Sequence, residues 1–349
     1  MTPMKITQIM LAEGFGGAER HFVDLSLSLA DRNYQIQAIC HSKFAHQDTL
    51  SQHPNIQVTP VRIWGKWDVF AAKHIQNAIA HFSPHIIHTH LARGAYIGGK
   101  AAKALNIPSV VNLHNYVNLK YYGNINHFIA ATEDQKNYLK KQAIASEHIT
   151  VMPHFSLLPA VPPKPLPEHQ PIQFMALGRI VKKKGFDVLI RAFRAYLDAG
   201  YDGLLAIGGG GVEQENLVQL VSELKLADKV EFSGWIEEIA TFLGKGDVFI
   251  LPSLDEPFGI VVLEAMASGK PIITTKTQGP ITILSSESAY FTEIGDVDSL
   301  TQSMIALSQH KAAATQKAIS ASKLYQTTYA ADAVVPKVEA IYHHLSKST

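Results

Sequence analysis

Cysteine is almost absent from this sequence, with Cys40 as its only copy. A disulfide within the chain is therefore excluded, and such sparing use of cysteine fits a reducing compartment such as the cytoplasm. Long hydrophobic runs are also missing, since no apolar stretch approaches the roughly 18 residues of a membrane-spanning helix. An excess of one charge sign is lacking as well, because 31 Lys and Arg balance 30 Asp and Glu. The chain as a whole therefore has no electrostatic attraction for nucleic acid.

Metal-ligand motifs are a further absence. The sequence has 17 histidines, but they are scattered and form neither an HExxH motif nor a paired-ligand spacing. We therefore expect no metal site and no cofactor. The hydrophobic share of 46% and the charged share of 17% are typical of a folded globular protein, and 349 residues suffice for two domains that each bury a core.

Short β-rich runs alternate with amphipathic helical stretches in the first half of the chain. Strands are expected at residues 5–11, 35–40, 56–61, 86–90, 110–114, 127–131 and 149–152, and helices at 17–31, 68–82, 93–105 and 133–142. Repeated strand–helix–strand units with apolar strands predict a parallel sheet that is covered by helices on both faces.

Proline then interrupts this alternation. Residues 153–171 contain seven prolines, which remove backbone donors and resist both helix and sheet. Strands resume at 172–178, 204–209, 230–234, 248–252 and 271–275, and helical stretches follow at 312–325 and 332–346. The pattern predicts two doubly wound α/β domains, over residues 1–158 and 172–329, joined by an extended linker at 159–171. We expect the last helix, at about 330–349, to pack back on the first domain.

The most informative segment reads PSLDEPFGIVVLE. It follows an apolar strand and opens a helix, so the backbone amides near Phe258, Gly259 and Ile260 are free at the positive end of that helix, as a phosphate site requires. Glu256 and Glu264 stand eight positions apart, which is at most about 12 Å along a helix. Taken alone, two such glutamates also fit an N-terminal helix acid and a solvated side chain.

The sequence around these glutamates, EPFGIVVLEAMASGKP, resembles the EPFG–Glu signature of the large retaining GT-B glycosyltransferase family called family 4. That family includes many bacterial lipopolysaccharide and glycolipid glycosyltransferases. Further similar segments extend the resemblance over essentially the whole chain: GGAE at 16–19, GR at 178–179, KG at 184–185, FSGW at 232–235 and GDVFILPS at 246–253. The resemblance implies the GT-B fold, in which two Rossmann-like domains face each other across a cleft. The first domain would bind the acceptor and the second the nucleotide-sugar donor.

The resemblance also implies roles for charged residues of the second domain. Glu264 would hold the ribose hydroxyls and Glu256 the hydroxyls of the transferred sugar, because a carboxylate can accept two neighbouring hydroxyl groups. Arg179 and Lys184 would stabilise negative charge on the departing diphosphate, which without a metal needs fixed cations and helix amides. Lys182 is expected to remain on the surface.

Glycines are expected to complete the donor site. Gly16 and Gly17 lie where a strand passes into a helix, so their backbone can approach phosphate or sugar closely, although a tight turn with positive φ explains them as well. Gly178 belongs to the GR turn. Gly209 lies in a four-glycine stretch that either admits the nucleotide base or is a flexible turn. Trp235, from the FSGW segment, is assigned to the donor by the resemblance.

Two turns depart from the family pattern. PHFS at 153–156 stands where the family often has an Asn-Gly turn, which places the acceptor-side or hinge contacts in question. QGPI at 278–281 stands where a double glycine and an acid are common. Gly279 is therefore expected to approach the donor without an acidic neighbour.

Histidines and loop aromatics are the candidates for the acceptor side. His114 resembles the histidine that the family places beside the reacting sugar, although a lone histidine at a strand end is also a common structural residue. His90 ends the neighbouring IIHTH strand, and we expect His88 to point the other way. Trp64, in WGKW, and Tyr122 lie in loops that mix aromatic and cationic residues. Such loops suit a membrane interface or a stacked sugar, or else pack onto their own domain.

These features predict a metal-independent retaining glycosyltransferase that moves a hexosyl or N-acetylhexosaminyl group from a nucleotide-diphosphate sugar, with UDP favoured. The acceptor would be a sugar hydroxyl of a glycan or lipid-linked glycan in lipopolysaccharide or envelope polysaccharide synthesis. No family motif supplies an Asp or Glu nucleophile, so the resemblance implies retention by a front-face route. We expect a cytoplasmic location, with peripheral contact to the inner face of the cytoplasmic membrane as a further hypothesis.

Other nucleotide-binding functions are compatible with parts of this pattern. A nicotinamide dehydrogenase is disfavoured, because no GxGxxG with an acidic partner follows the first strand. A nucleotide-sugar epimerase and a non-catalytic nucleotide-sugar sensor of the same architecture remain alternatives.

Overall fold

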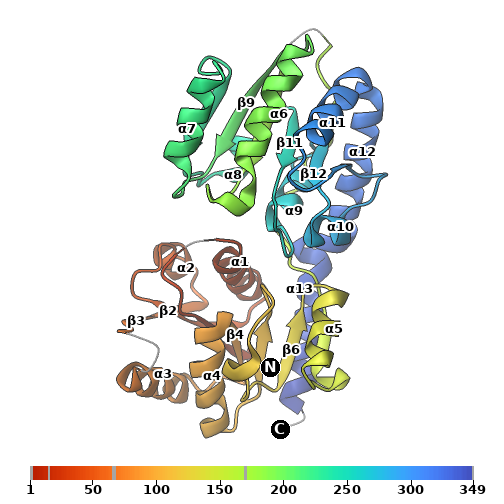
Figure 1. The fold of residues 1–349 in the computed structure, drawn as a ribbon. Helices are drawn as coiled ribbons and strands as arrows, with labels where there is room; N and C mark the ends of the chain where they lie inside the picture. The colour runs from red at the N-terminus through yellow and green to blue at the C-terminus, as the bar shows by residue number, and fades with distance from the viewer. Residues whose placement is uncertain (1–2, 15, 65–67, 169–170, 348–349) are drawn as a thin grey trace. The chain divides into compact units, whose positions relative to one another are not determined.

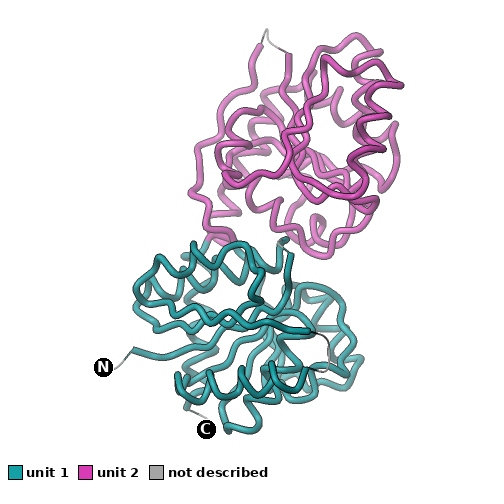
Figure 2. Tube along the Cα trace, turned by 90° about the vertical axis from the view of Figure 1, so that its left-hand side faces the viewer, with its two compact units in different colours: residues 1–155, 331–349 teal, residues 156–330 magenta. Residues whose placement is uncertain are grey.

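The computed structural model describes residues 3–14, 16–64, 68–168 and 171–347. The chain divides into two compact units, which Figure 2 shows in different colours. Unit 1 comprises Met1–Phe155 together with Ala331–Thr349, and unit 2 comprises Ser156–Ala330. Each unit is built on one parallel sheet, so the predicted α/β class is confirmed.

Seven strands form the sheet of unit 1, in the order β3-β2-β1-β4-β5-β6-β7. Their bounds are β1 Lys5–Met10, β2 Gln35–His41, β3 Ile56–Val61, β4 Ile86–His90, β5 Ser109–Asn112, β6 His127–Ala130 and β7 Ile149–Val151. Successive side chains of a strand face opposite sides. Ile6 and Ile86 accordingly lie in one core cluster, and Ile9 and Ile87 lie in another. The central strands are therefore apolar on both faces, as a sheet covered on both sides requires.

Helices cover both faces of this sheet (Figure 1). They are α1 Gly17–Asp31, α2 Gln47–Ser51, α3 Val69–Phe82, α4 Leu91–Leu105, α5 Glu133–Lys141 and α13 Ala331–Lys347, with 3-10 turns η1 Leu119–Tyr121 and η2 Ser146–His148. Helices α1 and α13 pack on the face of Ile6, and α3 and α4 pack on the face of Ile9. Helix α13 follows unit 2 in the chain, yet it buries Val334, Val338 and Tyr342 in the core of unit 1.

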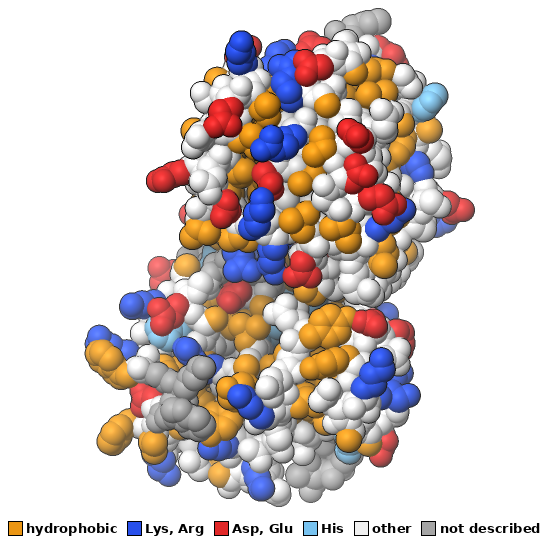
Figure 3. All heavy atoms as spheres, viewed as in Figure 1, with side chains coloured by type: hydrophobic (Ala, Val, Ile, Leu, Met, Phe, Trp, Pro, Cys, Tyr) orange, Lys and Arg blue, Asp and Glu red, His pale blue; other side chains and the backbone are white. Residues whose placement is uncertain are grey.

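Six parallel strands form the sheet of unit 2, in the order β10-β9-β8-β11-β12-β13. Their bounds are β8 Ile172–Leu177, β9 Gly203–Gly208, β10 Val230–Gly234, β11 Val248–Leu251, β12 Ile272–Thr275 and β13 Tyr290–Thr292. The core of this unit joins α6 residues Leu189 and Phe193, which are four positions apart on one helix face, to Ile207 and Ile250 of the sheet. On the face of the molecule shown in Figure 3, acidic and basic side chains are interspersed.

The helices of unit 2 flank this sheet (Figure 1). They are α6 Phe186–Asp198, α7 Gln214–Glu223, α8 Ile239–Gly244, α9 Ile260–Ala267, α10 Gln278–Ile283, α11 Val297–Gln309 and α12 Lys311–Leu324, with the 3-10 turn η3 Lys182–Lys184 and the π-helical segment η4 Tyr325–Tyr329. The proline-rich segment belongs to unit 2 and lies along it. The backbone N–H of Val161 donates to the carbonyl of Ala267 over 2.7 Å, and Leu166 is buried in the unit 2 core.

Candidate active site

Each sheet has a topological switch point. In unit 1, β1 lies between β2 and β4, and in unit 2, β8 lies between β9 and β11. The chain leaves such neighbouring strands toward opposite faces of the sheet, which opens a crevice at the carboxyl edge where ligands of α/β sheets bind. The residues predicted to act on a donor follow β1, β8, β9, β10 and β11, and His90 ends β4.

Two turns meet at the switch point of unit 2. The carbonyl of Lys183, after β8, accepts from the backbone N–H of Leu254 over 2.8 Å and from that of Asp255 over 3.3 Å. Gly185 has φ of +65°, and a Cβ there would overlap the carbonyl oxygen of Pro252. Only glycine fits such a position without strain. The GR…KG turn and the segment that follows β11 are thus held against each other by their backbones.

The side chains of Lys184 and Glu256 form an ion pair across these turns. Only 13% of the Lys184 side chain and 11% of the Glu256 side chain are exposed. Removing one partner of such a pair would leave an uncompensated charge with little access to water, which is strongly destabilising. The two motifs therefore deliver one cation and one carboxylate to the same place.

The start of α9 lies directly beyond Glu256. Gly259 caps this helix with φ of +92° and ψ of 66°. The N–H of Val262 donates to the carbonyl of Gly259 over 2.9 Å, whereas the amides of Gly259 and Ile260, at the very start of the helix, have no partner within it. Glu264 is buried on the same helix. Gly279 of α10 packs so closely that a Cβ would overlap the carbonyl of Phe258, and its N–H donates to the carbonyl of Glu256 over 2.8 Å. The QGPI departure thus supports the turn that positions Glu256.

The four-glycine stretch after β9 is tightly packed. Gly209 has φ of +127°, a Cβ there would overlap the carbonyl of Gly178, and its N–H donates to the carbonyl of Gly234 over 2.6 Å. A Cβ on Gly211 would overlap the carbonyl of Ile180 in the same way. Gly209 and Gly211 are therefore held in close contact with neighbouring turns, whereas a Cβ on Gly210 would meet nothing within 4 Å.

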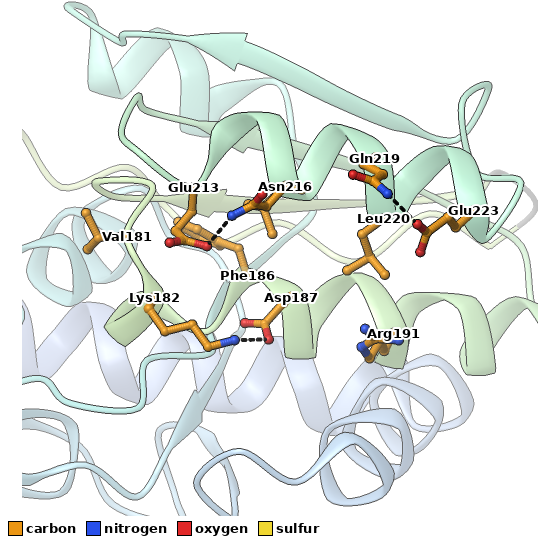
Figure 4. Close-up of a pocket in the computed structure, with 11 residues that line it drawn as sticks. Val181, Lys182, Phe186, Asp187, Arg191, Glu213, Asn216, Gln219, Leu220 and Glu223 are labelled. Atoms are coloured by element: carbon orange, nitrogen blue, oxygen red, sulfur yellow. Dashed lines mark hydrogen bonds and ion pairs between the residues drawn. The ribbon is translucent and has the colours of Figure 1, made fainter.

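The remaining cations of the β8–η3 turn differ in their surroundings. Arg179 is exposed, and the described residues supply no hydrogen-bond or ion-pair partner for its guanidinium. Lys182 instead bonds to Asp187 over 2.8 Å. Figure 4 shows this pair at a polar groove of about 270 Å³ between α6 and α7, which Glu213 and Arg191 also line. Lys182 is thus engaged on the surface, as predicted, and the groove holds none of the predicted donor residues.

Trp235 lines a hollow that neither Lys184 nor Glu256 lines. The residue is 52% exposed, and the hollow, of about 440 Å³, is also lined by Met175 and Phe242. No other residue predicted for the donor site lines that hollow.

In unit 1, the glycine loop after β1 opens a long helix. Gly16 is the N-cap of the 15-residue α1 and adopts an extended conformation, with φ of −154° and ψ of −163°. A positive φ at Gly16 is therefore not the reason for this glycine. Gly17 is the first residue of α1 and is exposed. Because neither glycine has a side chain, these two positions leave the N-terminal amides of α1 uncovered.

Five histidines gather at the carboxyl edge of the unit 1 sheet: His21 of α1, His88 and His90 of β4, His114 after β5, and His154 after β7. The rings of His88 and His90 stack with centroids 4.9 Å apart, and those of His114 and His154 stack at 4.7 Å. His21, His88, His90 and His154 are buried, and His114 is partly exposed. Of the five, the sequence had singled out His90 and His114 as site residues.

Hydrogen bonds link four of these rings, those of His21, His88, His90 and His114, directly or through other side chains. His90 Nδ1 lies 3.2 Å from His114 Nε2, and His90 Nε2 lies 2.9 Å from Gln8 Oε1. His88 Nδ1 lies 2.5 Å from the Tyr342 hydroxyl. Desolvation by burial lowers the pKa of His88 to about 3 and that of His154 to about 4. Burial also lowers the pKa of the other three rings, with neighbouring histidines as a second cause. All five rings are therefore neutral at physiological pH.

Two expectations for unit 1 need correction. His88 does not point away from His90, because residues two apart in a strand face the same side. Tyr122 is buried in the core with Phe128, so its ring is not available to an acceptor. Trp64 does match an exposed loop residue, with 77% of its surface exposed. The other three residues of WGKW lie outside the described residues.

Comparison with known families decides the identity. The model described as Glycosyltransferase Family 4 matches residues 15–155, and the model described as Glycosyl transferases group 1 matches residues 160–323. The chain belongs to the family 4 glycosyltransferases. The predicted family and enzyme class are therefore confirmed.

Named relatives of this glycosyltransferase agree with that assignment. The lipopolysaccharide core biosynthesis glycosyltransferase LpsD of Rhizobium meliloti is 29% identical over 292 residues, which are 80% of this chain and 81% of the relative. The structure of Anabaena Alr3699/HepE in complex with UDP matches with a TM-score of 0.84 at 18% identity, over 98% of this chain and 100% of that chain. The lipopolysaccharide outer core galactosyltransferase WaaB matches with a TM-score of 0.71 at 18% identity, over 98% and 99%. These structures share the fold of the glycosyltransferase.

Two absences complete the description. In the part of the glycosyltransferase that the structure describes, no group of three or more His, Cys, Asp or Glu could hold a metal ion. No helix among those residues is long and apolar enough to cross a membrane.

Proposed function

We propose that this glycosyltransferase transfers a hexosyl or N-acetylhexosaminyl group from a UDP-sugar to a sugar hydroxyl of a glycan or glycolipid, with retention of anomeric configuration. The observation that carries the donor assignment is the Lys184–Glu256 pair beside the start of α9 at the switch point of unit 2. This arrangement brings together a cation and helix amides, which suit a diphosphate, and a carboxylate, which suits sugar hydroxyls.

The donor half of the reaction follows from these groups. The diphosphate would lie against the amides of Gly259 and Ile260, with Lys184 and the exposed Arg179 as its cations. Glu256 would accept hydrogen bonds from the transferred sugar, and Glu264 from the ribose. As the bond between the anomeric carbon and the diphosphate breaks, negative charge develops on the leaving oxygen, and these fixed groups stabilise it.

The acceptor hydroxyl would attack the same face of the sugar that the diphosphate leaves. The new bond joins the acceptor oxygen to the anomeric carbon, and the acceptor proton passes to the departing diphosphate. In this scheme Gly16 and Gly17 let the start of α1 approach the donor, and His114 lies beside the reacting sugar. Retention is tested by proton NMR of the first product formed. An inverted anomeric centre would contradict the front-face route.

Support for UDP and for an envelope glycan comes from the relatives. The HepE structures contain UDP and, in another complex, UDP-glucose. LpsD is named for lipopolysaccharide core biosynthesis. We therefore place the acceptor among lipopolysaccharide or envelope polysaccharide precursors. A nucleotide-sugar epimerase would instead change its substrate without any acceptor, and product analysis in the absence of an acceptor separates the two.

The donor assignment is tested by thermal unfolding with UDP, GDP, ADP or TDP, each with and without EDTA. A ligand at about 100 times its dissociation constant stabilises a protein by roughly 2.7 kcal/mol, or several degrees at about 2–4 °C per kcal/mol. We expect UDP to give the largest shift, unchanged by EDTA. A larger shift with another base would overturn the choice of UDP, and no shift with any nucleotide would overturn the donor site.

We also propose that unit 1 contacts an anionic membrane through Trp64, which follows β3, and Phe70, in the first turn of α3. Trp64 is 77% exposed and Phe70 is 90% exposed. The Arg62 guanidinium lies 4.0 Å from the Trp64 ring centroid, and Lys73 is exposed one turn into α3. Aromatic groups combined with cations suit the boundary between lipid headgroups and acyl chains. Because Trp64 follows the carboxyl end of β3 and His90 ends the parallel strand β4, both residues lie at the same edge of the sheet.

Co-sedimentation with phosphatidylcholine vesicles, with and without phosphatidylglycerol, tests this contact. We expect binding to the anionic vesicles that is weakened by Trp64→Ala with Phe70→Ala. Val218→Ala, at an exposed apolar position of unit 2, serves as the control and should leave binding unchanged. Failure of the unaltered protein to co-sediment would contradict the proposal.

A further inference from the structure

A single hydrogen-bonded chain runs through the histidine cluster to His114. Its order is His114, His90, Gln8, Tyr342, His88, Asn112 and His21. Its consecutive distances are 3.2, 2.9, 3.4, 2.5, 3.1 and 2.5 Å. The members come from β1, β4, β5, α1, α13 and the segment after β5. Six of them are buried, and His114 alone is partly exposed. The chain therefore has one end that faces solvent, and that end is the histidine assigned to the reacting sugar.

The amide of Gln8 gives the chain a direction. Its oxygen faces His90 Nε2 and its nitrogen faces the Tyr342 hydroxyl. An amide oxygen only accepts and an amide nitrogen only donates. His90 must therefore carry its proton on Nε2, which leaves His90 Nδ1 as an acceptor. A neutral His114 then donates from its own Nε2 to His90 Nδ1.

The other half of the chain agrees with this direction. The Tyr342 hydroxyl accepts from Gln8 and so donates its own proton to His88 Nδ1. His88 then carries its proton on Nε2 and donates to the Asn112 amide oxygen. The Asn112 amide nitrogen donates in turn to His21 Nε2. Every bond in the chain has one donor and one acceptor when all four histidines are neutral, and burial keeps them neutral by lowering each pKa.

We propose that Gln8 and Tyr342 are positioning residues that hold His114 as the neutral tautomer with its proton on Nε2 and its Nδ1 unprotonated. The inference rests on the proposed function, in which His114 lies beside the transferred sugar. A histidine with a fixed tautomer presents one defined acceptor nitrogen to a sugar hydroxyl, because the second nitrogen is occupied by His90. Tyr342 brings the C-terminal helix α13 into this arrangement, although it lies 228 positions after His114 in the chain.

The test is a two-bond proton–nitrogen NMR spectrum of the full chain labelled with ¹⁵N-histidine. The protonated and bare nitrogens of a neutral imidazole have well-separated ¹⁵N shifts. His114→Gln identifies the His114 signals by their loss. In the unaltered protein we expect His114 to show a single tautomer protonated on Nε2. In Gln8→Met, which keeps the shape of the side chain and removes both hydrogen bonds, both nitrogens should move toward intermediate shifts.

Tyr342→Phe and Thr7→Val complete the design. Tyr342→Phe removes one hydroxyl and should move the His114 signals in the same sense as Gln8→Met, and it keeps the test open if Gln8→Met does not fold. Thr7→Val removes a buried bond of 2.8 Å to Gln37 from the same strand β1, but this bond is not part of the chain. It should leave the His114 tautomer unchanged.

Activity provides the second readout. With a UDP-sugar that the glycosyltransferase turns over, Gln8→Met should lower kcat by about tenfold at unchanged KM for the donor, because a misoriented group costs rate more than binding. Thr7→Val should keep kcat. The proposal is overturned if His114 is protonated on Nδ1 in the unaltered protein, if neither variant moves its ¹⁵N shifts, or if the shifts move without any change in kcat. The spectra need no substrate, so they test this proposal independently of the donor. A wrong donor assignment would instead show itself as a missing thermal shift with UDP.

Discussion

Lys184 and Lys182 are two cations of one short turn with different surroundings. Lys184 forms an ion pair with Glu256 that is largely shielded from water, and Lys182 bonds to Asp187 at the surface. We predict that Lys184→Met lowers the rate of sugar transfer by about 100-fold or more, since it removes a fixed cation from the leaving diphosphate. Lys182→Met, the matched control, should change the rate by less than about twofold, because an exposed ion pair contributes little. Steady-state kinetics of both variants provide the measurement, and equal losses would contradict the assignment.

Gly209 and Gly210 offer a second matched comparison at this scale. A side chain at Gly209 would overlap the carbonyl of Gly178 and would have to adopt φ of +127°, whereas a Cβ on Gly210 would meet nothing within 4 Å. We predict that Gly209→Ala destabilises unit 2 by at least about 2 kcal/mol through strain and overlap. Gly210→Ala should be neutral or stabilise by up to about 1 kcal/mol. Urea unfolding of both variants measures these changes in the free energy of unfolding. Equal effects of the two substitutions would contradict the prediction, because a flexible loop would tolerate both.

At the scale of the elements, the histidine cluster makes the stability of unit 1 depend on pH. In the unfolded chain a histidine takes up a proton near pH 6.5, whereas burial keeps the pKa of His88 at about 3 and that of His154 at about 4. Unfolding therefore binds protons between about pH 6.5 and 4. The free energy of unfolding should fall over that range as pH falls, by about 1.4 kcal/mol per pH unit for each proton.

Asp24 of α1 acts in the opposite sense. Burial raises the pKa of Asp24 to about 6, against the influence of Arg20. Its stabilising contribution to the free energy of unfolding is therefore present at low pH and is lost as the pH rises through about 6. Because five histidines oppose this one carboxyl, the net free energy of unfolding should still fall as the pH falls. Calorimetry between pH 5 and 7 should show the loss on acidification. His154→Asn should reduce the slope by about one proton, and His81→Gln, at an exposed position, should not; an unchanged slope in the first variant would contradict the account.

The secondary structure could be predicted best where apolar periodicity was strong. Strands β3, β4 and β10 and helix α1 have the bounds that the sequence predicted. The short elements α2, β13 and η4 were not anticipated, because five or fewer residues do not establish a period. The interpretation of His88 failed for a different reason, since alternation in a strand places residues two apart on one face.

The residues of the candidate site also differ in how well the sequence predicts them. The unit 2 residues could be predicted because Lys184 and Glu256 lie within contiguous motifs, and such motifs are local in sequence. The histidine cluster could not, because its members come from segments that only the folded sheet brings together. One signal was present in the sequence: Gln8 is a polar residue inside the apolar strand β1, and a buried amide needs partners.

At the scale of the whole molecule, the order of the chain and the division into units do not coincide. The chain completes unit 2 at Ala330 and then returns to unit 1 through α13. The alternation of strands and helices predicts two sheets, whereas the partners of the last helix depend on which core its apolar face meets. That face, with Val334, Val338 and Tyr342, lies in the same cluster as Ile6 and Ile86.

This arrangement separates the stability of the two units. We predict that Val334→Ala with Val338→Ala destabilises unit 1 by about 2–5 kcal/mol, from lost burial and the cavities left behind, and lowers one calorimetric transition. Lys337→Ala, on the exposed side of the same helix, should have little effect. The transition of unit 2 should stay in place and should still move upward with UDP, because the groups assigned to the diphosphate after β8 and β11 lie in unit 2. If the double variant instead abolished the UDP shift, UDP binding would depend on the integrity of unit 1. Gly16 and Gly17 would then have to contribute more to UDP binding than Arg179 and Lys184 do.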